Sequence, residues 1–412
     1  MNKLSFSQLA YITMGQSPNG EYCGINIKGV PLLNGPAEFT EFAPIPVQYT
    51  SDPKKMSKVG DILFCVRGST TGRMNWSNQE YAIGRGLAAI THKEGKQYNH
   101  FLKYLIENYL SSLLNNTNGS TFPNLTSSLL ADFIVDVPNL PIQKKISNLL
   151  ANIDKKIELN NQINTELETM AKTLYDYWFV QFDFPDAEGK PYKSSGGKMI
   201  YHEVLKREIP EGWENGTFGD YSKVKSGFAF KSTWWSDEGV PVLKIKDVLE
   251  NYTLNQTDFS FVPQCKVPNN SESFTSKAGD VVIAMTGATI GKFAAIPYTK
   301  KPILINQRVG LYQLGEDPFK KLPFLINSMK QDFFRLKVFQ IAGGAAQPNI
   351  SNEQLNSFPL NYPSDNLIGK FNERLADSYK LIATNIKQNK DIEELRDWLL
   401  PMLMNGQVTV SQ

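Results

Sequence analysis

The sequence predicts a mixed α/β fold of the α+β kind, in which two similar globular domains are separated by two long antiparallel coiled-coil helices. Two observations lead to this prediction. In residues 141–178, apolar or packable residues recur at alternating steps of three and four, which is the rhythm of a coiled-coil helix. The second half of the chain also repeats the first, in the order domain, helix, domain, helix. The chain therefore has an internal pseudo-two-fold repeat.

Composition and charge are those of an ordinary globular protein. The chain has 412 residues, of which 41% are hydrophobic and 20% charged, enough for about two to three domains. The net charge is +2, so a DNA-binding surface would require local clustering of Lys and Arg. No run of eighteen apolar residues and no signal-peptide core occurs, and the three cysteines form no CxxC pair. We expect a cytoplasmic protein without a membrane segment or metal site.

Residues 1–140 form the first predicted globular domain, because short apolar runs alternate there with Gly, Pro and Asn. Residues 60–69 predict a buried strand that ends in a glycine turn, and 81–90 predict a strand pair. Residues 101–114 predict a short amphipathic helix, which a loop at 115–126 follows.

The first long helix is predicted over 141–182. No Gly or Pro interrupts its rhythm after Pro141, and that proline suits the first turn of a helix. At ~1.5 Å rise per residue, the coiled-coil stretch is about 55 Å long and needs a partner to bury its apolar stripe. Residues 183–209 are rich in Gly, Pro, Ser and Lys and are predicted to be a linker.

The pattern of the first domain returns in residues 210–364, the second predicted domain. The matched segments are 29–35 with 239–245, 58–75 with 277–294, the strand around Arg85 with 303–312, 101–110 with 324–333, and 118–126 with 343–351. Residues 365–408 then repeat the long helix. Two similar helices in one chain most economically pack against each other, and the linker permits an antiparallel pair with the two globular domains at opposite ends.

Both predicted long helices carry two asparagines at positions of the apolar stripe. Asn160 and Asn164 recur as Asn385 and Asn389, at an offset of 225 residues. Buried asparagines at such positions cost stability but fix the register and orientation of a coiled coil, while the alternative is that they face solvent. The C-terminal ends align less cleanly, because matching 176–178 with 397–399 gives an offset of about 221 residues.

Several helix residues are predicted to pack the helices or to dock a partner. For Trp178 and Trp398, near the helix ends, we expect a seal between helix and globular domain first and partner docking second. The predicted set is Ile153, Ile157, Asn160, Asn164, Trp178, Ile382, Asn385, Asn389 and Trp398.

The sequence lacks the motifs of the common catalytic sites. None of its three histidines lies in an HExxH motif or beside a metal-spaced cysteine. Residues 287–293 imitate a phosphate loop, but three residues separate the glycines where four are needed, and no Ser or Thr follows Lys292. We also find no glycine-rich cofactor loop and no Asn-Pro-Pro-aromatic or Asp-Pro-Pro-aromatic tetrapeptide for methyl transfer. We therefore expect a non-catalytic binding protein without a cofactor.

Taken together, the duplicated domains and three sequence stretches resemble the specificity subunit of type I restriction-modification systems over essentially the full chain. The stretches are PIQKKISNLLANIDKKIELNNQ at 141–162, LYDYWFVQFDFP at 174–185, and ELRDWLLPMLMNGQV at 394–408. The resemblance implies two target recognition domains, each of which reads half of a bipartite site in double-stranded DNA. It also implies that the long helices set the gap between the half-sites and dock two methyltransferase subunits, which translocase/nuclease subunits then join. Catalysis, S-adenosylmethionine and ATP would belong to those partners.

Most candidate DNA-binding residues lie in loops that the repeat places equivalently, while Lys225 and Lys231 lie in an aromatic-basic stretch that could also border DNA. Arg suits guanine and Asn or Gln suits adenine, while Lys, Arg and hydroxyl groups suit phosphates. The candidates are Arg67, Thr70, Arg73, Arg85, Asn124, Lys225, Lys231, Thr289, Lys292, Arg308, Gln347 and Asn349. Alternatives remain: Gly68, Gly72, Gly287 and Gly291 are expected to serve turn geometry. Arg73 and Lys292 suit either a phosphate contact or a surface ion pair. Trp234 and Trp235 are expected to serve packing, and the alternative is that they border DNA.

Two other functions remain open at this point. One is a stand-alone nuclease or methyltransferase, which the missing motifs disfavour. The other is a coiled-coil scaffold with two protein-binding heads that binds no nucleic acid.

Overall fold

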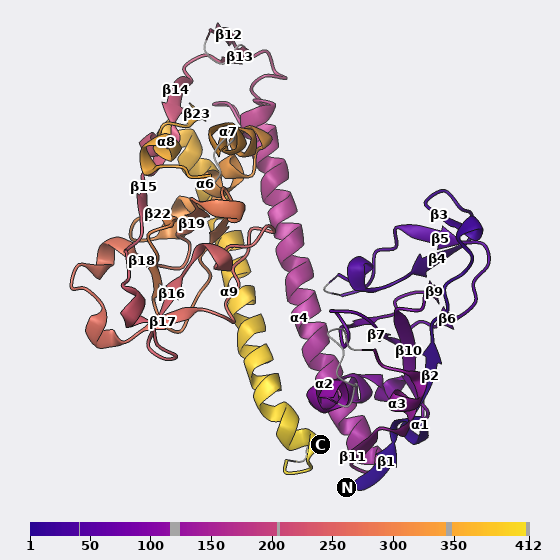
Figure 1. Ribbon diagram of the computed structural model, residues 1–412. Coiled ribbons are helices and arrows are strands. Elements are labelled where there is room, and N and C mark those ends of the chain that lie inside the picture. The colour runs from indigo at the N-terminus through magenta and orange to yellow at the C-terminus, as the bar shows by residue number, and fades with distance from the viewer. Residues whose placement is uncertain (41, 116–123, 204–206, 343–347, 409–412) are drawn as a thin grey trace. The chain divides into compact units, whose positions relative to one another are not determined.

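The computed structural model describes all residues except 41, 116–123, 204–206, 343–347 and 409–412. The chain forms two compact units, which are coloured by residue number in Figure 1. Unit 1 comprises Met1–Leu159 with Asp391–Gln412, and unit 2 comprises Asn160–Lys390. Each unit contains a part of each of two long helices, α4 (Leu140–Tyr175) and α9 (Asp365–Met404). The remainder of each unit is called its head.

The first sheet of the unit 1 head has four antiparallel strands in the order β2-β10-β7-β8. Its strands are β2 (Ala10–Met14), β7 (Ile62–Cys65), β8 (Met74–Trp76) and β10 (Leu87–His92). Alternate residues of β7 enter different cores: Ile62 and Phe64 join the core that contains helix α2 (Asn99–Asn115), while Leu63 and Cys65 join the core between the sheets. This two-sided burial explains the unbroken apolar run of the sequence.

The second sheet of the unit 1 head has the order β3-β5-β4-β9-β6, in which β4 and β9 are parallel and the other pairs antiparallel. Its strands are β3 (Cys23–Gly24), β4 (Val30–Leu33), β5 (Gln48–Thr50), β6 (Met56–Ser57) and β9 (Tyr81–Ile83). A short ladder of β1 (Asn2–Ser5) with β11 (Ile134–Val137), and the helices α1 (Phe6–Leu9) and α3 (Ser127–Asp132), complete the head.

The head of unit 2 repeats this topology, except that its second sheet has no counterpart of β3 among the described residues. Its four-stranded sheets have the orders β15-β22-β19-β20 and β17-β16-β21-β18, with β16 and β21 again parallel, and β14 pairs with β23. The strands are β14 (Glu214–Thr217), β15 (Val224–Ser226), β16 (Val240–Leu243), β17 (Ser260–Val262), β18 (Thr275–Ser276), β19 (Val281–Ala284), β20 (Phe293–Ala295), β21 (Ile303–Ile305), β22 (Val309–Tyr312) and β23 (Pro359–Tyr362). The helices are α5 (Phe218–Tyr221), α6 (Leu322–Met329), α7 (Asp332–Ala342) and α8 (Asn352–Asn356). The predicted mixed fold and internal repeat are confirmed.

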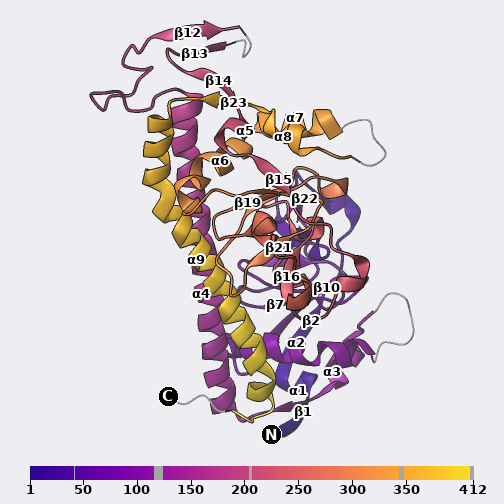
Figure 2. The ribbon, with the colours of Figure 1, turned by 90° about the vertical axis from the view of Figure 1, so that its left-hand side faces the viewer.

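Within each unit, α4 and α9 lie side by side and antiparallel, as Figure 2 shows. In unit 2, Asn160 of α4 pairs with Asn389 of α9, and four residues later Asn164 pairs with Asn385. Because the residue number rises along α4 while that of its partner on α9 falls, the two helices run in opposite directions. Helix α4 ends in a π-helical turn at Asp176–Val180.

The predicted linker folds on itself where the structure describes it. The Asp183 carboxylate accepts hydrogen bonds from the backbone N–H and the hydroxyl of Ser194, at 2.7 and 2.6 Å, and these bonds lower the Asp183 pKa. The ring of Phe184 stacks on Tyr192 at 4.7 Å between centroids. Strands β12 (Met199–His202) and β13 (Arg207–Pro210) then form a hairpin. No helix among the described residues is long and apolar enough to span a membrane.

Candidate nucleic-acid interface

Three loops of the unit 1 head are joined by backbone hydrogen bonds into one surface, which we call loop cluster 1. It consists of residues 66–73, 84–87 and 124–126. The Val66 N–H donates to the Gly86 carbonyl, and the Leu125 N–H donates to the Val66 carbonyl, both at 2.9 Å. The cluster is therefore held by main-chain contacts that leave its side chains available for other partners.

Unit 2 has the same arrangement, loop cluster 2, in residues 285–292, 306–309 and 348–351. The Met285 N–H donates to the Arg308 carbonyl at 3.0 Å, and the Ile350 N–H donates to the Met285 carbonyl at 2.9 Å. These bonds make Met285 the counterpart of Val66 and Arg308 the counterpart of Gly86. The repeat thus preserves the main chain of the clusters while it changes their side chains.

Four glycines shape both clusters. Gly68 and Gly72 have φ values of 87° and 96°, and Gly287 and Gly291 have 74° and 80°. Side chains other than glycine rarely adopt such values. The expectation that these glycines serve turn geometry is confirmed.

Loop cluster 1 contains every arginine of residues 1–140, namely Arg67, Arg73 and Arg85. All three side chains are exposed, and none forms an ion pair with a described residue. Arginines without a carboxylate partner keep their full charge and all their N–H donors for an external anion or base edge. The weak net charge of the chain therefore conceals a local basic surface.

The two basic residues of loop cluster 2, Lys292 and Arg308, differ in whether they have an ion-pair partner. The Lys292 ammonium lies 3.3 Å from the Glu250 carboxylate, so the surface ion pair, and not a free phosphate ligand, describes Lys292 here. Arg308 is exposed and has no ion-pair partner among the described residues. Both clusters thus keep free positive charge, but at different positions.

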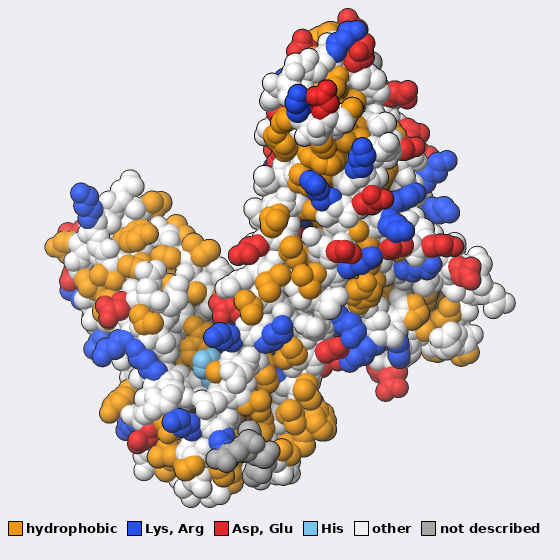
Figure 3. All heavy atoms as spheres, turned by 180° about the vertical axis from the view of Figure 1, so that it is seen from behind, with side chains coloured by type: hydrophobic (Ala, Val, Ile, Leu, Met, Phe, Trp, Pro, Cys, Tyr) orange, Lys and Arg blue, Asp and Glu red, His pale blue; other side chains and the backbone are white. Residues whose placement is uncertain are grey.

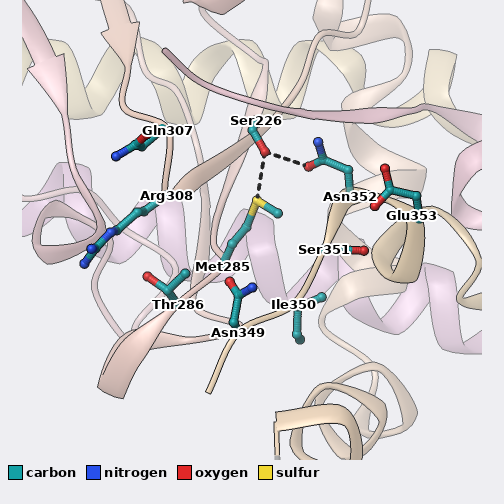
Figure 4. Close-up of a pocket in the computed structure, with 10 residues that line it drawn as sticks. All are labelled: Ser226, Met285, Thr286, Gln307, Arg308, Asn349, Ile350, Ser351, Asn352 and Glu353. Carbon is teal, nitrogen blue, oxygen red and sulfur yellow. Dashed lines mark hydrogen bonds between the residues drawn. The ribbon is translucent and has the colours of Figure 1, made fainter. Parts of the chain in front are cut away.

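A cavity of about 360 Å³ lies beside Arg308 in loop cluster 2. In Figure 4 the Gln307 and Arg308 side chains extend to the same side, opposite Glu353. The Thr286 hydroxyl oxygen is buried and has no hydrogen-bond partner among the described residues. The lining residues are Ser226, Met285, Thr286, Gln307, Arg308, Asn349, Ile350, Ser351, Asn352 and Glu353.

The remaining predicted loop residues divide into framework and surface. The Thr70 hydroxyl lies 3.5 Å from the Cys65 thiol, and the Thr289 hydroxyl oxygen is buried, so neither is an open phosphate ligand. Asn124 and Asn349 are exposed and form equivalent β-bridges, with Arg67 and Thr286 respectively. Gln347 lies outside the described residues.

Lys225 and Lys231 are exposed at the edge of the unit 2 head, on and just after β15. The Lys231 ammonium lies 5.7 Å from the centroid of the Trp234 ring. Trp234 and Trp235 are partly buried against the core between β16 and β17, which agrees with packing. The Lys244 ammonium lies 3.5 Å from the centroid of Trp235, and burial lowers the Lys244 pKa.

The asparagines of the helix pair are buried, with exposed fractions between 1% for Asn160 and 8% for Asn164. The Asn160 side-chain N–H donates to the Asn389 oxygen at 2.7 Å, and the Asn385 N–H donates to the Asn164 oxygen at 2.9 Å. Asn389 also donates to Asn161 at 2.7 Å. A shift of register would bury these amides without partners. The alternative that they face solvent is therefore wrong.

The predicted apolar helix contacts are also present. Ile157 is 7% and Ile382 6% exposed, while Ile153 is half-buried. The two tryptophans differ: Trp178 is 4% exposed and joins the aromatic core of unit 2, whereas Trp398 is 66% exposed.

The predicted seal at Trp398 is therefore wrong, and the reason is the alignment of the helix ends. At the offset that aligns the asparagines, the counterpart of Trp178 is Leu403, which is 3% exposed. Trp398 aligns instead with Thr173, which is also exposed. The match of 176–178 with 397–399 shifted the comparison by about one helical turn.

Acidic and basic side chains are interspersed over the face in Figure 3. This mixture agrees with the small net charge of the chain. Sequence matching paired the strand around Arg85 with 303–312 without fixing the counterpart of Arg85, which the backbone hydrogen bonds identify as Gln307. Thr286 had no sequence signal beyond its position before Gly287.

Comparison with known proteins gives concordant results. The family model described as the type I restriction modification DNA specificity domain matches residues 38–169 and 210–394. The type I restriction enzyme HindI specificity subunit of Haemophilus influenzae is 24% identical, over 98% of this chain and 95% of its own length. The MjaIX specificity subunit of Methanocaldococcus jannaschii is also 24% identical, over 86% and 78%.

A solved structure shares the fold. The crystal structure of a type I restriction-modification system S subunit from M. genitalium superimposes with a TM-score of 0.57 at 16% sequence identity. The match covers 98% of this chain and 96% of that one.

Proposed function

The chain belongs to the type I restriction-modification DNA specificity family, and we propose that each of its heads reads one half of an asymmetric, bipartite DNA site. It binds DNA and performs no catalysis itself. Methyl transfer is carried out by methyltransferase subunits, and cleavage by translocase/nuclease subunits that join them.

The observation that supports this proposal most strongly is the loop cluster that occurs twice with one main-chain framework and two sets of side chains. Arg67 of cluster 1 stands where Thr286 stands in cluster 2, and Arg85 stands where Gln307 stands. Direct readout depends on which side chains meet the base edges, so equivalent loops with unlike side chains select unlike sequences. The two half-sites should therefore differ, and the whole site should not be palindromic.

Arg73 is assigned to a DNA phosphate. It is exposed and lacks a carboxylate partner, and it follows Gly72 at the end of a tight turn. Replacing Arg73 by Ala should weaken binding to cognate and random DNA alike and reduce the slope of log affinity against log salt by about one. Lys292→Ala should have the smaller effect, because Glu250 already neutralises Lys292.

The helix pair is assigned two tasks. Its buried asparagines fix the register, so that the pair sets the distance between the two half-sites. Its exposed apolar residues are assigned to methyltransferase docking, with Leu395 at 52% and Trp398 at 66% exposure as the principal anchors on α9. Trp398→Ala should reduce methyltransferase affinity in a pull-down without lowering the thermal stability of the free chain.

The experiment that tests the proposed function is a map of methylated adenines in cells that carry the complete system and in cells that lack only this chain. Loss of the chain should abolish methylation of one bipartite motif. A methylation map that does not change would contradict the proposal. The scaffold alternative predicts no gel shift on any DNA when the methyltransferase is present.

A further inference from the structure

We propose that the first central residue of one β-turn in each head determines a base: Arg85 of unit 1 selects guanine in its half-site, and Gln307 of unit 2 selects adenine in the other. This inference rests on the proposed function and deepens it. It assigns different bases to two side chains that occupy the same structural position.

The two turns share the backbone hydrogen bond that closes each turn and the one that joins each turn to the neighbouring strand. In unit 1 the Leu87 N–H donates to the Gly84 carbonyl at 3.0 Å, which closes a turn with Arg85 at its first central position. The Gly84 N–H donates in turn to the Leu33 carbonyl, at 2.8 Å. The turn joins β9 of one sheet to β10 of the other.

Unit 2 repeats these bonds. The Val309 N–H donates to the Asn306 carbonyl at 2.9 Å, which places Gln307 at the first central position. The Asn306 N–H donates to the Leu243 carbonyl at 3.0 Å, and the turn joins β21 to β22. Arg85 and Gln307 are therefore counterparts, a match that the sequence alone left ambiguous.

In the unit 1 turn, Arg85 lies between Gly84 and Gly86, so it is the residue of these three that carries a side chain. A Cβ atom at Gly84 would lie 2.4 Å from the Asn34 side-chain oxygen, and a Cβ at Gly86 would lie 2.4 Å from the Asn34 carbonyl oxygen. The contact at Gly86 is with backbone and requires glycine there, whereas the contact at Gly84 is with the end of a side chain that can move. Arg85 is exposed and forms no ion pair with a described residue. Because the Arg85 guanidinium has no carboxylate partner, it contributes little to the stability of the fold and is available to an external partner.

Each reading residue has a fixed backbone. The Arg85 N–H donates to the Ser17 hydroxyl at 3.3 Å, and the Gln307 N–H donates to the Phe228 carbonyl at 2.9 Å. A side chain on a fixed main chain loses less freedom when it binds, so more of its hydrogen-bond energy contributes to discrimination.

Beside Gln307, the cavity of loop cluster 2 contains polar groups that lack partners. The Thr286 hydroxyl oxygen is buried without a hydrogen-bond partner among the described residues, and Arg308 next to it has no carboxylate partner. A base edge that approaches Gln307 would meet the exposed Arg308 guanidinium, whereas the Thr286 hydroxyl is buried and is not part of that surface.

The chemistry of the two side chains assigns the bases. The guanidinium of arginine donates two parallel hydrogen bonds, which match the O6 and N7 acceptors of guanine in the major groove. The glutamine amide has one donor and one acceptor, which match N7 and the N6 amino group of adenine. One position in the fold therefore reads a purine in each half-site and distinguishes the two by its side chain.

The test uses the complex of the full chain with its methyltransferase subunits and selects bound duplexes from a randomised library. We expect the wild-type complex to select a bipartite motif. Arg85→Gln should change one guanine of one half-site to adenine by about tenfold or more, the effect of one bidentate pair, and leave the other half-site unchanged. Gln307→Arg should change one adenine to guanine in the other half-site only.

Arg73→Gln is the matched control, because it removes an exposed arginine of the same cluster that is assigned to phosphate. It should lower affinity for all duplexes and leave the motif as it is. The proposal is overturned if Arg85→Gln and Gln307→Arg retain every wild-type base preference, or if they lower affinity uniformly as the control does. A wild-type complex that selects no motif would instead contradict the proposed function, and this assignment with it.

Discussion

The head of unit 1 and the head of unit 2 meet their helices at equivalent positions through different chemistry. In unit 1, the Tyr104 hydroxyl of α2 donates to the Asp154 carboxylate of α4 at 2.5 Å, and the Arg396 guanidinium of α9 donates to the same hydroxyl at 3.1 Å. In unit 2, the counterpart of Tyr104 is Asn327 of α6, which donates to the Tyr379 hydroxyl of α9 at 2.8 Å. The first of these contacts includes charged groups and is partly solvated, whereas the second joins neutral, buried groups. The unit 2 junction has its ion pair elsewhere, between Lys330 after α6 and Glu168 of α4, at 2.7 Å.

The aromatic content of the junctions differs as well. In unit 2, Phe371 of α9 packs between Tyr175, Trp178 and Phe179, with ring centroids 5.0 to 5.9 Å away. The corresponding part of unit 1 is aliphatic and includes Leu403. The comparison shows that the apolar stripe of the helices fixes where a head attaches, while the polar contacts there can vary. A duplicated chain can therefore diverge in its heads without losing its helix pair.

The largest effect is expected at the aromatic junction. Phe371 is 0% exposed, so Phe371→Ala should lower the stability of unit 2 by about 3–5 kcal/mol, the usual cost of removing a buried Phe side chain. Hydrogen exchange should show faster opening of α6 and of the nearby parts of α4 and α9. Ile146, the counterpart of Phe371 at the offset that aligns the asparagines, is also 0% exposed, so Ile146→Ala is the matched variant and should act in unit 1, with a cost of about 2–5 kcal/mol. If the amides of α6 exchanged as slowly in Phe371→Ala as in the wild type, the aromatic junction would not be what stabilises unit 2.

A smaller effect is expected at the asparagine pair. Asn164→Ala leaves the Asn385 amide buried without its partner and should cost about 1–3 kcal/mol in thermal or denaturant unfolding. Replacing both residues by Leu should restore the stability and weaken the preference for one register. If the double variant were as unstable as the single one, the hydrogen bond would not be the cause.

The ionic junction of unit 1 should give a smaller effect still. Arg396→Ala removes a guanidinium whose side chain is 19% exposed and should cost about 1–2 kcal/mol, more at low than at high salt. Lys172→Ala breaks an exposed i,i+4 ion pair with Asp176 and is the control, with no measurable change expected. If Arg396→Ala and Lys172→Ala lowered the free energy of unfolding equally, the Arg396 contacts would contribute no more than an ordinary surface ion pair.

The smallest expected effect is opposite responses of the two heads to acid. In unit 1, burial lowers the His92 pKa, so stability is present above about pH 6.5 and is lost as the pH falls and the unfolded state binds more protons. In unit 2, burial raises the Asp247 pKa to about 6, so stability is lost as the pH rises through 6 and is regained as it falls. Because burial also raises the pKa of Asp61 in the unit 1 head, each contribution is isolated by its own variant. Hydrogen exchange between pH 7 and 5, corrected for intrinsic rates, should show a smaller loss of protection on acidification in unit 1 of His92→Leu, and a smaller gain in unit 2 of Asp247→Asn, than in the wild type.

Much of this architecture follows from the sequence. The three-four rhythm predicted both long helices, and the repeat predicted two heads of one topology, because apolar periodicity and glycine turns are local signals. The asparagines were correctly expected to be buried, since they recur at equivalent stripe positions in both helices.

The errors arise where side chains depend on distant neighbours. Sequence matching aligned residues 397–399 with 176–178, which places Trp398 about one helical turn from its true counterpart. The reason is that a local match of aromatic residues was preferred to the register that aligns the asparagines. The Lys292–Glu250 ion pair joins residues that lie far apart in the sequence, and the pairing of Arg85 with Gln307 appears only in the backbone hydrogen bonds. Base-reading residues are difficult to predict from the repeat, because the repeat preserves the main-chain framework of the loops and not the side chains that contact bases.

In the function we propose, one helix pair, held in register, sets the gap between two heads that read different half-sites. The most direct test of this claim is the DNA motif selected by a chain with one extra heptad in each helix, after Leu159 and after Lys390, in complex with its methyltransferase. Seven residues add about 10.5 Å, or roughly three base pairs. We predict the same two half-sites with the gap lengthened by about three base pairs. The same motif with an unchanged gap would contradict the claim.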